Sequence, residues 1–159
     1  RYISVTGVQT CALPIYAGNL QGNANCVGNN VSPHLKWTNV PEGTKSFAIF
    51  MIDPEGRAPV GVAHWIAYGI PANVTEFAEG EVGVASNKYV GGKSTMNVGN
   101  YVGPCTPAGI GFHHYTFLVM ATDLEPGAMA AGMTREEATA ALTGHVKGST
   151  GIVGLFGRP

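Results

Sequence analysis

Short apolar runs separated by turn residues set the hydrophobic pattern of the chain. The run Phe47–Ile52 follows a Pro-Glu-Gly turn and ends at Asp53-Pro54. An apolar run of this length between turn signals is typical of a strand that is buried on both faces. Three later runs rich in apolar residues are also predicted to be strands: Ala63–Ile70, Tyr115–Ala121 and Ile152–Phe156.

A helical pattern occurs only near the C-terminus. Thr134 and Glu137 have the spacing of a capping box, with Thr134 as the N-cap. Apolar residues at 138, 141, 142 and 146 then recur at helical spacing, and Gly148 is placed to stop the helix. Strands at irregular spacing with a late amphipathic helix predict a mostly β protein, a β-sandwich with one or two peripheral helices near the C-terminus.

The composition limits the class of protein. The chain has 159 residues, enough for one domain, and its 23 glycines and 10 prolines indicate many turns between short strands. Charged residues make up 12% and the formal net charge is −1, so there is no basic stripe of the kind that binds nucleic acid. No apolar run approaches the roughly 20 residues that cross a bilayer. We therefore expect a weakly charged globular domain with no nucleic-acid partner and no transmembrane segment.

The first residues do not fit this pattern. Val5–Ile15 resembles one translated reading frame of a common sequencing adaptor, and the alternative is a genuine edge strand broken at Pro14. We interpret residues 1–21 as an artefact, or as an unstructured or poorly fitting segment, and assign residues 22–159 to one domain. The chain has an odd count of three cysteines. When this segment is set aside, Cys11 is removed and Cys26 and Cys105 remain as a pair.

Several polar residues lie within or beside the apolar runs. Asp53 ends the first buried strand, where its carboxylate needs hydrogen-bond donors, unless it only caps its own Asp-Pro turn. His64 lies mid-strand and His113 begins the third strand, and such histidines taken singly are more often core residues than functional ones. The segment 100–109 has prolines too rigid and glycines too free for a strand. We interpret it as a shaped loop that presents backbone N–H groups and the Tyr101 hydroxyl to a cavity.

Motifs that carry these polar residues follow one another along most of the chain. They are Cys26–Trp37, Val40–Phe47, Asp53–Pro59, His64-Trp65 with Ile70-Pro71, Gly103–Pro107, and His113-His114-Tyr115. In this order they resemble the phosphatidylethanolamine-binding protein (PEBP) family, and more specifically its bacterial Raf-kinase-inhibitor-like branch. The likeness covers about residues 22–159.

Three positions depart from the family pattern. Glu55 replaces the second Asp of the Asp-Pro-Asp-x-Pro box, Thr106 replaces a Pro of the Gly-Pro-Cys-Pro-Pro loop, and His114 replaces the Arg of the His-Arg-Tyr strand. The first change keeps the charge. The last removes a fixed cation beside the pocket and puts anion affinity in question.

The resemblance implies a Greek-key antiparallel β-sandwich with a small pocket for phosphate-type anions or phospholipid headgroups such as phosphoethanolamine. It also implies a binding protein without enzymatic activity, metal or cofactor. Carried over to this sequence, the ligand-binding residues are Asp53, His64, Tyr101, Gly103, Pro104, Pro107 and His113, with Pro54, Glu55, Trp65, Cys105 and Tyr115 in support.

The chemistry of these residues suits an anion. A carboxylate near an imidazole raises the pKa of the imidazole and favours its cationic form, so we expect phosphate binding to strengthen as the pH falls through the imidazole range. Asp53 has an alternative role, in which it faces the ammonium group of an ethanolamine headgroup.

Three alternative functions use the same chain. Asp53, His64 and His113 supply the ligand types of a facial metal triad. Cys105 with His113 as a base would make a hydrolase. Finally, family members are described as inhibitors of kinases or serine proteases, which implies a surface for an unidentified protein partner.

The cysteine pair bears on the compartment. Cys26 and Cys105 are either two small buried thiols or a disulfide, and a disulfide would imply an oxidising compartment. With few Lys and Glu and many Asn, Gly and Thr, the composition favours a periplasmic or secreted protein, with the cytoplasm as the alternative. We expect a monomer or a homodimer.

Overall fold

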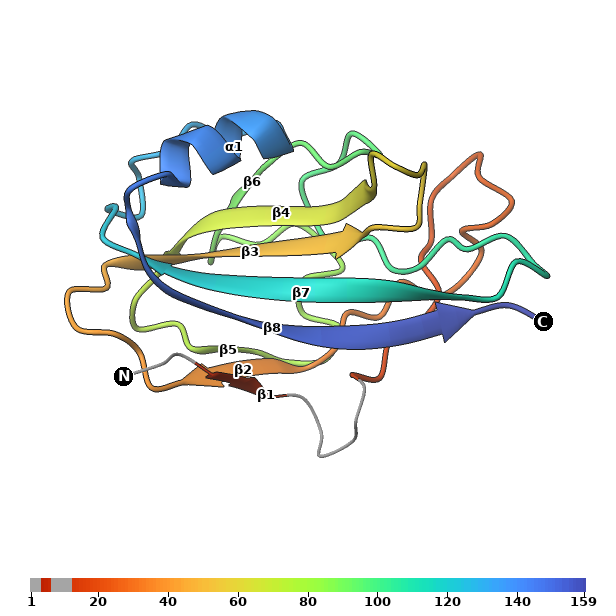
Figure 1. Ribbon diagram of the computed structural model, residues 1–159, viewed down its shortest axis with the longest axis horizontal. Coiled ribbons are helices and arrows are strands. Elements are labelled where there is room, and N and C mark those ends of the chain that lie inside the picture. Colours follow the sequence, from red (N-terminus) through yellow and green to blue (C-terminus); the bar gives the residue numbers. More distant parts are fainter. Residues whose placement is uncertain (1–3, 7–12) are drawn as a thin grey trace.

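The computed structural model describes residues 4–6 and 13–159. Its regular elements are antiparallel strands and one short helix, which are joined by turns and loops (Figure 1). The elements in chain order are β1 (Ser4–Thr6), β2 (Leu35–Thr38), β3 (Ser46–Asp53), β4 (Val62–Pro71), β5 (Glu76–Phe77), β6 (Val90–Gly91), β7 (Phe112–Thr122), α1 (Arg135–Leu142) and β8 (Val146–Gly157). The mostly β, antiparallel fold expected from the sequence is confirmed.

Two sheets face each other across the main core. The smaller has the strand order β1-β2-β5 and the larger β6-β4-β3-β7-β8. Trp37 of β2 packs edge-on against Phe47 of β3 with ring centroids 5.3 Å apart, and Phe77 of β5 packs against Trp65 of β4 at 6.0 Å. These aromatic contacts between the sheets make the sandwich, because each sheet buries one face against the other.

The central strand β3 is apolar throughout because both of its faces are covered. Phe47, Ile49 and Met51 point into the main core between the sheets. Ala48 and Phe50 point the other way, into a second cluster that includes Leu142 of α1. Successive strand residues face opposite sides, so a strand between two cores has no polar alternation.

The helix begins where the sequence predicted it and ends earlier. Thr134 accepts from the backbone N–H of Glu137, and the Glu137 carboxylate accepts from the N–H of Thr134, which completes the capping box. The predicted continuation to Val146 is wrong, because the helix ends at Leu142 and Val146 begins β8. No helix in the described ranges is long and apolar enough to span a membrane.

Pairing with β7 explains the early end of the helix. Gly144 adopts the left-handed φ of +85° and turns the chain. From Val146 onward, β8 pairs with β7 along the whole length of that strand, and Gly148 lies opposite Ala121. The helical spacing of Val146 was therefore a coincidence that long-range strand pairing overrode.

Residues 13–21, which we placed outside the domain, pack with it. Leu13 and Ile15 are buried in the main core, and the Leu13 N–H donates to the Val153 carbonyl at 2.9 Å. The boundary at residue 22 is thus too late among the described residues, because apolar side chains from the earlier segment complete the core. Residues 7–12 of the adaptor-like segment, Cys11 included, lie outside the described residues. The origin of the segment stays an interpretation.

Candidate functional site

A pocket of about 180 Å³ opens at one end of the large sheet. It lies where β3 and β8 end and where β4 and β7 begin, at the right-hand end in Figure 1, away from α1. Its polar wall comes from Asn23, Asp53, Arg57, His64, Thr106, His113 and Tyr115, and the remaining lining residues are Gly56, Val62, Met96, Cys105 and Pro107.

Asp53 has both carboxylate oxygens engaged. It is the last residue of β3 and only 3% exposed. Its Oδ1 accepts from the backbone N–H groups of Glu55 at 3.0 Å and Gly56 at 2.9 Å. Its Oδ2 lies 2.8 Å from Nδ1 of His113, which donates to it. Asp53 therefore caps its own turn and also orients His113.

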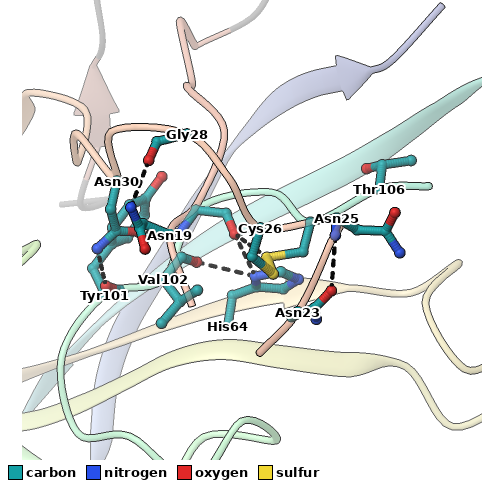
Figure 2. Close-up of a disulfide and its surroundings, with 12 residues drawn as sticks. Asn19, Asn23, Asn25, Cys26, Gly28, Asn30, His64, Tyr101, Val102 and Thr106 are labelled. Carbon is teal, nitrogen blue, oxygen red and sulfur yellow. Dashed lines mark hydrogen bonds between the residues drawn. A yellow bond between two sulfur atoms is a disulfide. The ribbon is translucent and has the colours of Figure 1, made fainter. Parts of the chain in front are cut away.

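His64, unlike the accepting Asp53, donates a hydrogen bond to the backbone. Its Nδ1 lies 3.0 Å from the Val102 carbonyl oxygen, as Figure 2 shows, and 3.2 Å from that of Gly103. Carbonyl oxygens only accept, so Nδ1 carries the hydrogen. Burial lowers the pKa of His64 and outweighs the opposing effects of these carbonyls and of Asp53. The expectation that a nearby carboxylate makes this imidazole cationic is therefore wrong, because the side chain is too deeply buried.

The phenol of the pocket is Tyr115, not Tyr101. The Tyr115 hydroxyl lies 2.6 Å from Oγ1 of Thr106, and burial raises the pKa of Tyr115 far above its ordinary value. Tyr101 is fully buried in the core and stacked on Phe117, and its hydroxyl has no hydrogen-bond partner among the described residues. The prediction that Tyr101 faces the cavity is wrong, because in this loop its side chain turns inward against Trp65.

The loop after Tyr101 divides into a supporting part and a lining part. The Gly103 N–H donates to Oδ1 of Asn30, and the Pro104 carbonyl accepts from the Gly18 N–H. A Cβ on Gly103 would lie 2.4 Å from the Tyr16 carbonyl, so only glycine allows this approach. Gly103 and Pro104 thus hold the loop in place, and the lining is supplied by Cys105, Thr106 and Pro107.

A disulfide anchors this loop beside the pocket. Cys26 and Cys105 are bonded at 2.04 Å, so the disulfide alternative is the one that the structure contains (Figure 2). A bonded Cys105 has no thiolate, and the alternative of a Cys105 nucleophile with His113 as its base therefore does not hold in this state.

Arg57 is the main site residue that the sequence analysis missed. It lies in the turn after Asp53, with a left-handed φ of 50°, and lines the pocket. Its guanidinium supplies a permanent positive charge on the described wall, where the family's Arg is replaced by His114. A cation four residues after Asp53, which ends the buried strand, was a visible signal. Asn23 and Met96 had no such signal in the sequence, because they reach the pocket wall from separate loops.

The remaining supporting residues lie outside the wall. His114 points away from the pocket, and its Nδ1 lies 2.6 Å from Oε1 of Glu55. Burial by itself would raise the pKa of Glu55, but hydrogen bonds from His114 outweigh it and lower that pKa. Pro54 is exposed, and Trp65 faces the core, where its ring packs on Tyr89.

The metal alternative involves a different set of residues from the one predicted. Asp53, Glu55 and His113 have ligand-type atoms within 4.8 Å of one another, whereas His64 is not in this group. Nδ1 of His113 and both oxygens of Asp53 are already hydrogen-bonded within the protein. An ion would therefore meet Nε2 of His113 and an Asp53 carboxylate that already accepts three hydrogen bonds, and a histidine held by a carboxylate is itself a common arrangement at metal sites.

Sequence comparison finds relatives over most of the chain. The family profile described as phosphatidylethanolamine-binding protein matches residues 13–157. A UPF0098 protein of Aquifex aeolicus is 38% identical over 136 residues, which are 84% of this chain and 78% of that protein. The "Putative lipoprotein LppC" of Mycobacterium tuberculosis is 35% identical over 156 residues, 92% of this chain and 71% of that protein.

Structural comparison finds the same fold in solved proteins. The crystal structure of Escherichia coli YbcL, described as a new member of the mammalian PEBP family, matches with a TM-score of 0.82 at 27% identity and covers all of both chains. CT736 of Chlamydia trachomatis matches with a TM-score of 0.78 at 26% identity over 99% of each chain. The expectation drawn from the spaced motifs is confirmed: this chain belongs to the phosphatidylethanolamine-binding protein family.

Proposed function

We propose that the protein is a non-enzymatic binding module whose pocket takes a phosphate-type anion, as free phosphate or as a phosphorylated headgroup such as phosphoethanolamine. The observation that carries this proposal is the Asp53–His113 pair, joined at 2.8 Å on the wall that also holds Arg57. When His113 is protonated, Asp53 holds the imidazolium in place and leaves its Nε2–H for a ligand. Guanidinium and imidazolium together are the usual partners of phosphate oxygens.

A binding role suits the state of the other groups in the pocket. Cys105 is in a disulfide, so it has no thiolate to act as a nucleophile. Burial raises the pKa of Tyr115, which keeps its phenol protonated. Pro107 and the disulfide hold the wall in shape, which lowers the ordering cost of binding.

The test is calorimetric titration of inorganic phosphate and of phosphoethanolamine into wild-type protein and His113→Gln. We expect His113→Gln to bind at least about tenfold more weakly, since charge-assisted hydrogen bonds carry the interaction. His145→Gln is the matched control, because His145 also pairs with an aspartate at 2.8 Å, but on the surface and far from the pocket. Equal affinity of wild type and His113→Gln, or no shift of the His113 NMR resonances with phosphate, would reject the proposal.

A regulatory protein contact beside the pocket is the second candidate function. Ile110 and Phe112 are 55% and 72% exposed; Ile110 lies just before β7, and Phe112 is the first residue of that strand, next to His113. Exposed apolar side chains next to a ligand pocket favour a partner whose binding the ligand gates, such as a kinase or a serine protease. Replacing Phe112 with Ser should abolish capture of such a partner and leave phosphate affinity unchanged.

We also propose that the protein works in an oxidising compartment, the periplasm or outside the cell. The Cys26–Cys105 disulfide supports this location, since cytosolic thiols are kept reduced. The relative LppC carries a lipoprotein name, which is consistent with export in the family. Fractionation of cells that express the natural full-length protein, with intact mass before and after reduction, tests it.

A further inference from the structure

We propose that the pocket selects a phosphoryl group that carries a proton, and therefore binds phosphomonoesters and inorganic phosphate in preference to phosphodiesters and sulfate-type anions. The inference rests on the proposed anion-binding function and adds the ligand class. Its basis is the hydrogen-bonding polarity of His64, which lines the pocket with an acceptor where an anion site would be expected to offer a donor.

The backbone fixes the tautomer of His64. Two carbonyl oxygens, from Val102 and Gly103, lie 3.0 and 3.2 Å from Nδ1, and both can only accept. The hydrogen of the neutral ring is therefore on Nδ1, and Nε2 holds a lone pair. His64 is 3% exposed, and burial lowers its pKa, which favours the neutral ring.

The Nε2 atom of His64 lacks a donor from the protein. Among the described residues, no hydrogen bond reaches this atom, and His64 contributes to the pocket wall. A ligand O–H group that enters the pocket can donate to this lone pair. A ligand that offers only lone pairs would instead be repelled by Nε2.

The rest of the wall adds both kinds of group. The Arg57 guanidinium only donates, and the Asp53 carboxylate only accepts. The hydroxyl groups of Tyr115 and Thr106 are hydrogen-bonded to each other. The wall thus combines donors for anionic oxygens with acceptors for a hydroxyl, all within a pocket of about 180 Å³.

A phosphomonoester monoanion matches this wall, since it has one P–OH and two oxygens that share the negative charge. With a second pKa near 6, about a tenth of a phosphomonoester is still in this form at pH 7. A phosphodiester has no P–OH, and sulfate has no proton near neutral pH. Free phosphoethanolamine is therefore preferred over the phosphate of an intact phosphatidylethanolamine, which is a diester.

Two ions of equal charge and shape test the proposal. Methylphosphonate at pH 6 is a monoanion with one P–OH, and methanesulfonate is a monoanion with none. Calorimetric titration at matched ionic strength should give at least about tenfold tighter binding for methylphosphonate. Phosphoethanolamine should likewise exceed its soluble diester, glycerophosphoethanolamine, and phosphate should exceed sulfate.

Two variants separate the hydroxyl contact from general anion attraction. His64→Gln places an amide where the fixed lone pair was, and we expect the preference for methylphosphonate over methanesulfonate to shrink towards one. Arg57→Gln, on the exposed rim, should weaken both ions while leaving their ratio unchanged. If His64→Gln does not fold, the wild-type comparison decides, and ¹⁵N NMR of wild type should show the hydrogen of His64 on Nδ1.

The outcomes distinguish this inference from the proposed function. Binding of methylphosphonate and methanesulfonate with equal affinity overturns the proton selection but leaves an anion pocket. Binding of neither ion, nor of phosphate, overturns both. A His64 hydrogen found on Nε2 also overturns the proton selection, whatever the affinities.

Discussion

At the residue scale, the buried Asp53 connects a turn with a binding wall. Its two oxygens accept from two backbone N–H groups and from His113, so both oxygens have partners inside the protein. A buried charge is tolerated only with such partners. The sequence posed two roles for Asp53 as alternatives, a cap for the Asp-Pro turn and a member of the site, and the structure shows one side chain in both.

Asp53→Asn should therefore be strongly destabilising. The amide keeps the shape but loses the charge that holds His113 and accepts from the turn, and removing one partner of a buried pair costs about 3–5 kcal/mol. Chemical denaturation measures the loss. Asp123→Asn is the control, because Asp123 also accepts from a histidine, His145, at 2.8 Å but lies at the surface. A loss no larger than that of the control would contradict the account of Asp53.

His64 should make the protein sensitive to mild acid. Burial lowers the pKa of His64 in the folded state, whereas the unfolded chain takes up a proton near the ordinary value of about 6.5. The unfolded state then binds more protons, so the free energy of unfolding falls as the pH drops below that value, by up to about 1.4 kcal/mol per pH unit. Denaturation at pH 7 and pH 5 should show a larger loss for wild type than for His64→Gln, and parallel losses would refute this.

At the element scale, local patterns predicted where elements lie and long-range pairing decided where they end. The four apolar runs are all strands, but β7 and β8 extend beyond the predicted limits because they pair with each other along their lengths. Val146 has the spacing of a helix residue, and Gly148 was placed to stop that helix. In the structure both belong to β8 and pair with β7. Single-sequence periodicity cannot choose between these, since the partner strand is more than 20 residues away.

The start of α1 is set by its cap, and Thr134→Ala should show this. The change removes the hydroxyl that accepts from the Glu137 N–H, and loss of an N-cap costs about 1 kcal/mol. Thr139→Ala is the matched control, since it removes the same atoms from an exposed position inside the same helix. Thermal unfolding should show a clear loss for the first and little change for the second. Equal effects would mean that the cap is not what stabilises the helix.

At the scale of the whole molecule, the site brings together segments that are distant in the sequence. Asp53, His64, Pro107 and His113 were predicted from motif resemblance and do meet in one pocket. Tyr101 was misplaced and Arg57 was missed, because the direction of a side chain in a loop depends on contacts that only the folded chain makes. The resemblance thus predicted which residues cluster, whereas their positions relative to one another depend on how the strand ends meet in the folded sheet.

The Cys26–Cys105 disulfide should be a major source of stability. It links residues 79 apart, and in the chain-entropy picture closing a loop of that size stabilises the fold by roughly 4 kcal/mol. The double variant Cys26→Ser, Cys105→Ser should lose much of this in guanidinium denaturation and bind phosphate more weakly, as Cys105 lines the pocket. The single variant Cys11→Ser serves as the control for thiol loss. A change below about 1 kcal/mol would exclude the disulfide as a main stabilising element.

The short contact between Leu13 and β8 bears on how the protein behaves at high concentration. β8 is the last strand of the large sheet, and on its outer side Leu13 forms a parallel bridge with Gly154. A Cβ at position 154 would lie 2.9 Å from the Ile15 side chain, so glycine there lets the segment lie close. An open strand edge is a template for pairing with other chains. Residues 13–15 thus cover part of the β8 edge, which leaves fewer of its backbone groups open to pairing with another chain.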